Sequence, residues 1–170
     1  MIENEASKET VYDVVVARHE DGSTRNYSAY FEDIGFEIVA SLRVGGYQGD
    51  WLFLLHNPDT GHFGFNTIGY GSCSGCDALL AHSSACWTYN DEGNRVLRDE
   101  GLEDLTDYLW RCVQRFKWAE TSEKLVGFLE DREWTSQFVS YGMTEDETAR
   151  SGYQEIDTVI SELEAYVSST

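Results

Sequence analysis

The pattern of apolar residues changes its period near residue 98, and this change limits the chain to a few fold classes. In residues 36–44 the apolar side chains alternate with polar ones, as on a strand that buries one face. Residues 62–70 alternate in the same way, and residues 51–56 form a continuous apolar run that suits a strand buried on both faces. The segment 57–61 contains a proline and a glycine and is typical of a turn. These residues predict an antiparallel β-meander.

Residues 11–18 predict a further strand, because the segment VYDVVVAR is short and rich in β-branched side chains. The whole segment 11–70 is therefore expected to be strand-rich.

After residue 98 the apolar residues recur at the spacing of a helix. One apolar stripe predicts a helix over 99–118, formed by Leu102, Leu105, Leu109, Val113 and Phe116. A shorter helix is predicted over 121–134, and another over 153–168, preceded by Thr144 and Glu147 in the spacing of a capping box. Strands followed by helices predict an α+β fold, with the helix-rich part at 77–168 and all 170 residues in one domain.

Charge narrows the functional classes more than any motif does. The chain has 31 acidic and 12 basic residues, a formal net charge of −19. Such a charge repels nucleic acid and anionic membranes and attracts basic surfaces. With neither a secretion signal nor an apolar run long enough to cross a membrane, the chain is expected to be cytoplasmic, in a host cell if a phage encodes it.

The segment GYGSCSGCDALLAH, residues 69–82, is the most unusual motif. Its two thiols lie where a strand is expected to end and a short helix, 78–85, to begin. A turn of small residues with buried thiols is the favoured interpretation, with no cofactor. A zinc site built from Cys73, Cys76, His82 and Cys86 remains open, as do a redox pair and a cysteine nucleophile.

Two strings of the sequence resemble a known pattern. GGYQGDW at 45–51, followed by GFNTIGYGSCSGCDAL at 64–79, is similar to a pattern of small uncharacterised proteins of bacteriophages and bacteria. That group has no agreed activity, so the resemblance implies an origin in a phage or bacterium and assigns no role to any residue.

The acidic side chains of the helical part are the candidate binding residues, because the apolar stripe does not account for them. They are Asp99, Glu100, Glu103, Asp104, Asp107, Glu130, Asp131 and Glu133. The sequence favours a protein without enzymatic activity that presents these carboxylates to the basic surface of a host nucleic-acid-binding protein, as a DNA mimic of the anti-restriction or anti-CRISPR type. An interaction or immunity module, a thiol enzyme using the CSGC turn, and a homodimer remain open.

Overall fold

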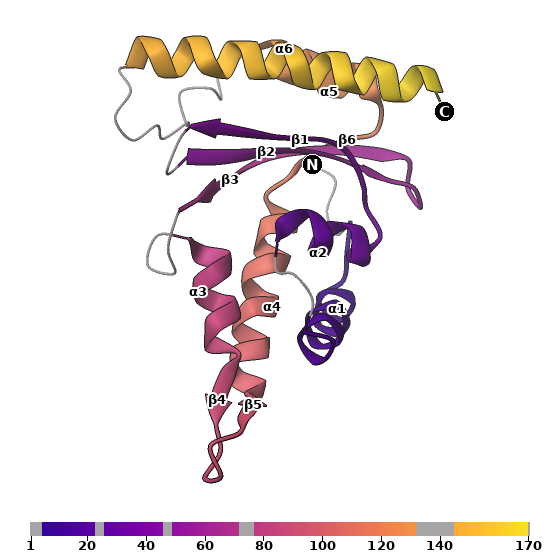
Figure 1. Ribbon diagram of the computed structural model, residues 1–170. Helices are drawn as coiled ribbons and strands as arrows, with labels where there is room; N and C mark the ends of the chain where they lie inside the picture. Colours follow the sequence, from indigo (N-terminus) through magenta and orange to yellow (C-terminus); the bar gives the residue numbers. More distant parts are fainter. Residues whose placement is uncertain (1–4, 23–25, 46–48, 72–76, 132–144, 170) are drawn as a thin grey trace.

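The structure is a computed structural model that describes residues 5–22, 26–45, 49–71, 77–131 and 145–169, with side chains of the last segment from residue 155. It is an α+β fold in three layers, with a four-stranded antiparallel sheet in the middle (Figure 1). The sheet has the order β1-β2-β3-β6 and is formed by β1 (Glu37–Gly45), β2 (Gly49–Asn57), β3 (His62–Tyr70) and β6 (Lys117–Ala119).

The predicted meander is confirmed. Strand β2 pairs with β1 on one side and with β3 on the other, so the three longest strands follow one another along the chain. The short strand β6 joins the free edge of β3, in a segment where the sequence predicts the end of a helix.

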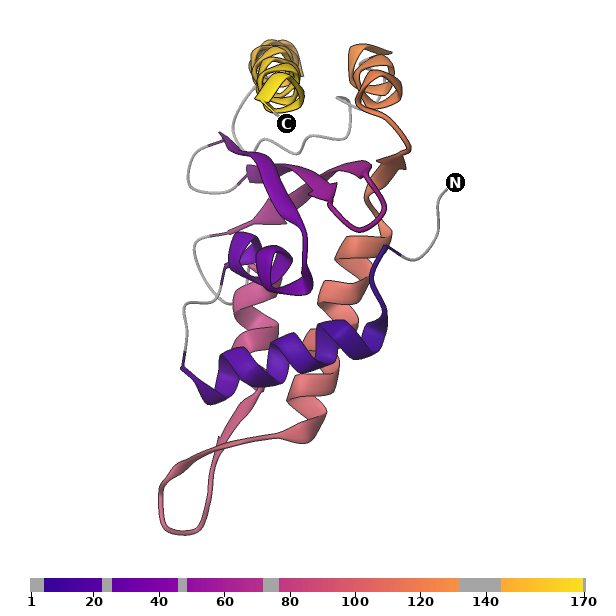
Figure 2. The same cartoon turned by 90° about the vertical axis from the view of Figure 1, so that its right-hand side faces the viewer.

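Helices cover both faces of the sheet. One layer holds α1 (Lys8–Glu20), α2 (Tyr27–Ile34), α3 (Ala78–Ala85) and α4 (Asp99–Gln114), and the other holds α5 (Ser122–Asp131) and α6 (Glu145–Ser169) (Figures 1 and 2). A second, two-stranded sheet, β4 (Trp87–Tyr89) with β5 (Arg95–Leu97), forms a hairpin that projects from the body between α3 and α4.

Strand β2 separates two apolar cores, as its continuous apolar sequence predicts. Phe53 and Leu55 belong to the core shared with α1, α2, α3 and α4. Leu52 and Leu54 belong to the core shared with α5 and α6. All four side chains are at most 1% exposed, so the sheet is buried on both faces along this strand.

The predicted strand at 11–18 is wrong, because these residues form most of helix α1. The Ser7 hydroxyl accepts a hydrogen bond from the Thr10 backbone N–H at 3.0 Å and caps the helix. Val11, Val15 and His19, four residues apart, form its buried face. Tertiary burial therefore outweighs the preference of β-branched residues for strands.

The predicted helices of the second half are present, and their bounds differ from the predicted ones. Helix α4 ends at Gln114, and Phe116 is buried just beyond it. Helix α5 spans Ser122–Asp131, and residues 132–134 of its predicted range lie outside the described residues. Helix α6 contains the predicted 153–168 and begins earlier, at Glu145. Thr144 of the predicted capping box lies outside the described residues.

Candidate functional site

The predicted acidic residues of α4 lie on its exposed side. The buried side of the helix carries Leu102, Leu105, Leu109 and Val113, all at most 4% exposed, as the apolar stripe predicts. Asp99, Glu100, Glu103 and Asp104 are exposed and Asp107 is partly buried. The packing of α4 therefore leaves all five carboxylates accessible to a partner.

Helix α1 adds two carboxylates that the sequence did not connect to this surface. Glu9 and Asp13 of α1 and Glu103, Asp104 and Asp107 of α4 line one groove of about 480 Å³. Its other lining residues are Lys8, Tyr12 and Thr106. We call this surface the α1–α4 groove.

Lys8 is the basic residue in the lining of the α1–α4 groove. Its ammonium forms an ion pair with the Asp107 carboxylate, with both side chains about half exposed. Since five carboxylates face one ammonium, the lining keeps a formal charge of −4. Outside the groove, Arg98 pairs with Glu100 at 3.0 Å. In the described part of the chain, Glu103 and Asp104 form no ion pair.

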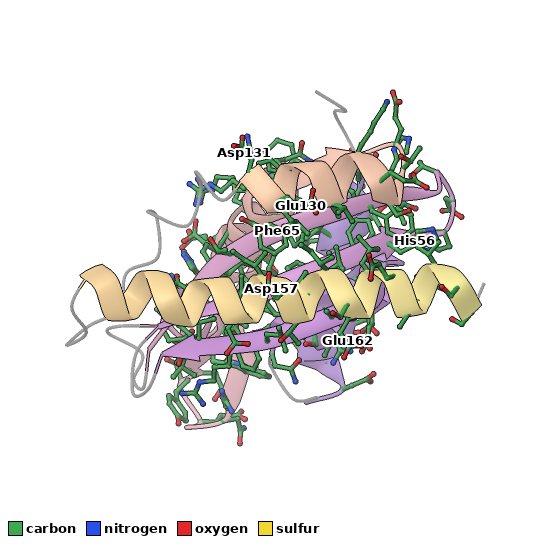
Figure 3. All side chains as sticks on the ribbon, turned by 90° about the horizontal axis from the view of Figure 1, so that it is seen from above. His56, Phe65, Glu130, Asp131, Asp157 and Glu162 are labelled. Carbon is green, nitrogen blue, oxygen red and sulfur yellow. The ribbon has the colours of Figure 1, made fainter. Side chains whose placement is uncertain are left out.

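The predicted residues of α5 do not extend this surface. Glu130 and Asp131 lie on α5, which covers the opposite face of the sheet from α4 (Figures 1 and 3). There they share the outer layer with the exposed carboxylates of α6, among them Asp157, Glu162 and Glu164. Glu133 lies outside the described residues. The predicted carboxylates that the structure describes thus lie on two separate acidic surfaces.

The β4–β5 hairpin is a projecting feature that the sequence analysis missed. The Asn90 side-chain oxygen accepts hydrogen bonds from the backbone N–H groups of Glu92 and Asn94, at 3.1 and 2.9 Å. Gly93 has a φ of +79°, which favours glycine. The Tyr89 side chain, next to this hydrogen-bonded turn, is 72% exposed. The hairpin tip is therefore ordered without support from the body.

The cysteines fall into two groups. Cys73 and Cys76 lie outside the described residues, so the CSGC turn stays a prediction. Cys86 is fully buried, and the single proton of its thiol is shared between the carbonyls of His82 and Gly101, at 3.3 and 3.2 Å from the sulfur. The pKa of the Cys112 thiol is raised to about 11 by burial, although a hydrogen bond with Tyr108 opposes this. The Cys112 thiol is thus protonated at neutral pH, and the Cys86 thiol is a hydrogen-bond donor to the backbone. Neither state favours nucleophilic chemistry.

Of the proposed zinc ligands, the structure describes His82 and Cys86. The His82 ring stacks on Tyr108 with 4.7 Å between the ring centroids. Among the residues that the structure describes, no three His, Cys, Asp or Glu side chains form a group that could hold a metal ion.

A network of polar residues joins α6 to the sheet. The Nδ1 atom of His56 lies 2.8 Å from a carboxylate oxygen of Glu37 and 2.9 Å from the hydroxyl of Tyr166. The Tyr166 hydroxyl also donates to the same Glu37 oxygen. Hydrogen bonds from His56 and Tyr166 lower the pKa of Glu37, whereas desolvation and Glu37 raise the pKa of Tyr166 to about 12. The network joins the C-terminal end of α6 to strands β1 and β2.

A second network ties the N-terminal segment to the turn between β2 and β3. The Glu5 side chain is 2% exposed, and its Oε2 atom accepts hydrogen bonds from Asn57 at 2.6 Å and Thr60 at 2.9 Å. His62 Nδ1 lies 2.7 Å from Glu5. Because this buried carboxylate is satisfied by three partners, its role is structural.

Comparisons with known proteins assign no family to this fold. No model of a protein family matches the chain, and no curated protein or solved structure is similar to it. In the described residues, no helix is long and apolar enough to span a membrane.

Proposed function

We propose that this chain is an acidic binding protein that occupies the basic groove of a nucleic-acid-binding partner and thereby inhibits it. In a host cytoplasm this is how a phage protein of the anti-restriction or anti-CRISPR type would act. The observation that carries the proposal is the α1–α4 groove, where two helices far apart in the sequence bring five carboxylates together against one ammonium.

The spacing of the carboxylates on α4 suits a surface that binds phosphates. From Asp99 to Asp107 the helix rises about 12 Å at 1.5 Å per residue, and five carboxylates lie along it. A strand of B-DNA carries one phosphate per about 3.4 Å of helix axis, so the two linear charge densities are similar. A groove built for phosphates would meet many carboxylates at once.

Electrostatic attraction between these surfaces has two expected consequences for binding. Association should be faster than between neutral surfaces of the same size, and binding should weaken as salt is added. Ion pairs at an exposed surface contribute little one by one, so the effect depends on the whole set of carboxylates.

Charge reversal on the two acidic surfaces tests the proposal. In one variant Glu103→Lys and Asp104→Lys change the α1–α4 groove, and in the matched control Glu162→Lys and Glu164→Lys change α6. Both variants alter the net charge by the same amount at exposed positions, which generally tolerate substitution. Immobilised wild type and variants would be used to capture host proteins at low and high salt, with folding checked by circular dichroism.

The proposal expects a captured protein that binds nucleic acid, that is released by added DNA or RNA, and that loses its nucleic-acid binding when the chain is present. The groove variant should lose this capture and the α6 variant should keep it. Equal losses in both variants would mean that only the net charge matters. Unchanged capture by the groove variant would mean that the acidity serves solubility alone.

The other interpretations of the sequence stay predictions. The thiol enzyme and the zinc-stabilised module depend on the CSGC turn, which the described residues do not include. Homodimerisation likewise stays a prediction that the molecular mass in solution would test.

A further inference from the structure

A pocket of about 560 Å³ lies where the N-terminal ends of α2 and α3 meet strand β2. It is separate from the residues that line the α1–α4 groove. The lining residues that define its chemistry are Tyr27, Trp51, Phe53, Asp77, Leu79 and Leu80. A volume of this size is in the range of pockets that hold small organic molecules.

The walls of the pocket are aromatic and aliphatic. Trp51 is partly exposed and is stacked on Phe53, with ring centroids 5.9 Å apart and an angle of 25° between the planes. Leu80, on the first turn of α3, is 43% exposed and faces the same pocket. An accessible indole beside an exposed leucine favours a ligand with a flat apolar part, because such a ligand removes both from water.

Asp77 gives the pocket its charge. One of its carboxylate oxygens accepts the Leu80 N–H at 2.9 Å, and the other accepts the Gly71 N–H at 3.4 Å. Each carboxylate oxygen can accept two hydrogen bonds, so both can accept one more. The phenol of Tyr27 stays neutral, because burial raises its pKa. The lining therefore carries one formal negative charge.

Two effects of charge oppose each other at this pocket. The helix N-termini of α2 and α3 carry partial positive charge, which favours an anion. Each N-terminus is capped by a side-chain oxygen, from Asn26 on α2 and Asp77 on α3, and only Asp77 brings a full charge. The chain as a whole has a net charge of −19, which raises the local concentration of cations. The charge of Asp77 and the net charge of the chain together outweigh the helix N-termini and favour a cation as the ligand.

We propose that this pocket binds a small organic cation that carries a planar aromatic ring. The ring lies against Trp51 and Leu80, and the ammonium group donates a hydrogen bond to Asp77. This is a ligand site independent of the proposed binding of a protein partner.

Three probes that share an indole ring and differ in charge test the proposal on the full chain. They are tryptamine, a cation, 3-methylindole, which is neutral, and indole-3-propionate, an anion. Dissociation constants would be measured by calorimetry and by ligand-observed NMR. Tryptamine should bind at least about fivefold more tightly than 3-methylindole, since a hydrogen bond to a charged group contributes more than a neutral one. Indole-3-propionate should bind most weakly.

Asp77→Asn separates the charge of this residue from its structural role. Asparagine caps helices as well as aspartate does, so α3 should be preserved while the negative charge is lost. In this variant the affinity for tryptamine should fall to that for 3-methylindole. Leu80→Arg, at an exposed position, should abolish binding of tryptamine. Gly127→Ala, on α5 at the opposite face of the sheet, should leave it unchanged, because a Cβ there meets nothing within 4 Å.

Each contrary result would overturn the proposal. Absence of binding by all three probes would mean that the pocket is not a ligand site. Tightest binding of indole-3-propionate would show that the helix N-termini dominate and that the ligand is an anion. Unchanged affinity for tryptamine in Asp77→Asn would remove the role of the carboxylate.

Discussion

The thiol of Cys86 donates a hydrogen bond to the backbone carbonyl of Gly101, with 3.2 Å between sulfur and oxygen. The contact is that short because Gly101 has no side chain. A Cβ at this position would lie 2.4 Å from the carbonyl oxygen of Ala85 and 2.6 Å from the Cα of Cys86. Helix α4 therefore approaches the end of α3, at the base of the β4–β5 hairpin, only with glycine at 101.

Gly101→Ala should destabilise the fold by about 2 kcal/mol or more, because both atoms that the new methyl group would meet belong to the backbone. Gly127→Ala on α5 is the matched control, since a Cβ there meets nothing within 4 Å. It should stabilise the fold by roughly 0.5–1 kcal/mol, the usual gain from replacing a helical glycine. Urea unfolding measures both. Equal stability of the two variants would show that the α3–α4 contact can relax.

The buried thiols should react only when the protein opens. In a Cys73→Ser, Cys76→Ser variant, Cys86 and Cys112 are the remaining cysteines, and burial raises the pKa of Cys112 to about 11. At pH 8 both should be labelled by a disulfide reagent at the rate of unfolding, and at once in denaturant. Rapid labelling of the native variant at either thiol would contradict the packing described for α3 and α4.

The Glu37 network should make stability depend on pH in the acid range. The pKa of Glu37 is lowered from its ordinary value of 4.5 by hydrogen bonds from His56 and Tyr166. A carboxylate with a lowered pKa in the folded state stabilises the fold above its unfolded pKa, and this contribution is lost as the pH falls through the folded pKa. Between about pH 5 and about pH 3, Glu37→Gln should therefore lose less stability than the wild type.

Tyr166→Phe provides a second arm for this measurement. It removes one of the two hydrogen bonds that lower the pKa of Glu37 and keeps the ring that packs against His56 and Phe63. Its acid dependence should lie between those of the wild type and Glu37→Gln. Three parallel curves of unfolding free energy against pH would show that the network does not stabilise the carboxylate.

The exposed ring of Tyr89 should contribute to partner binding in a way that salt does not change. Tyrosine is common among the residues that contribute most to interfaces, and the ordered hairpin presents this ring at little cost in entropy. Tyr89→Ala should weaken binding of the captured partner about tenfold, with the salt dependence of the wild type. The groove variant, in contrast, should lose capture at every salt concentration, because the attraction that salt weakens comes from its carboxylates. No loss of affinity in Tyr89→Ala would exclude this ring from the interface, and a reduced salt dependence would show that its contribution is electrostatic.

Local patterns in the sequence predicted the three long strands of the sheet but neither β6 nor the first two helices. The alternation of apolar and polar residues at 36–44 and 62–70 fits a strand and not a helix, and both segments form strands. In α1 the spacing of Val11, Val15 and His19 was present in the sequence, but the β-branched run concealed it. The signals for a helix were the capping residue Ser7 and, for α2, the capping residue Asn26.

Only the α4 side of the α1–α4 groove could be predicted from the sequence. The apolar stripe of α4 shows which of its carboxylates face outward, because one helix contains all the necessary information. The contribution of Glu9 and Asp13 depends on α1 packing beside α4, a contact between segments about 90 residues apart. Periodicity describes one segment at a time, so it does not reveal which segments meet. The same holds for the pocket formed by α2, β2 and α3.

The central strand has an unusual way of fixing its register. In most sheets a slip of one residue would move apolar side chains into water, and this cost keeps the strands aligned. In β2 such a slip would only exchange Leu52 and Leu54 for Phe53 and Leu55, since both faces are apolar. What distinguishes the faces is size. Phe53 packs against the rings of Tyr27 and Phe31 on one side, and the smaller Leu52 and Leu54 pack into the core under α5 and α6 on the other. Over Leu52–Leu55 the register of β2 therefore depends on the shapes of the two cores and not on their polarity.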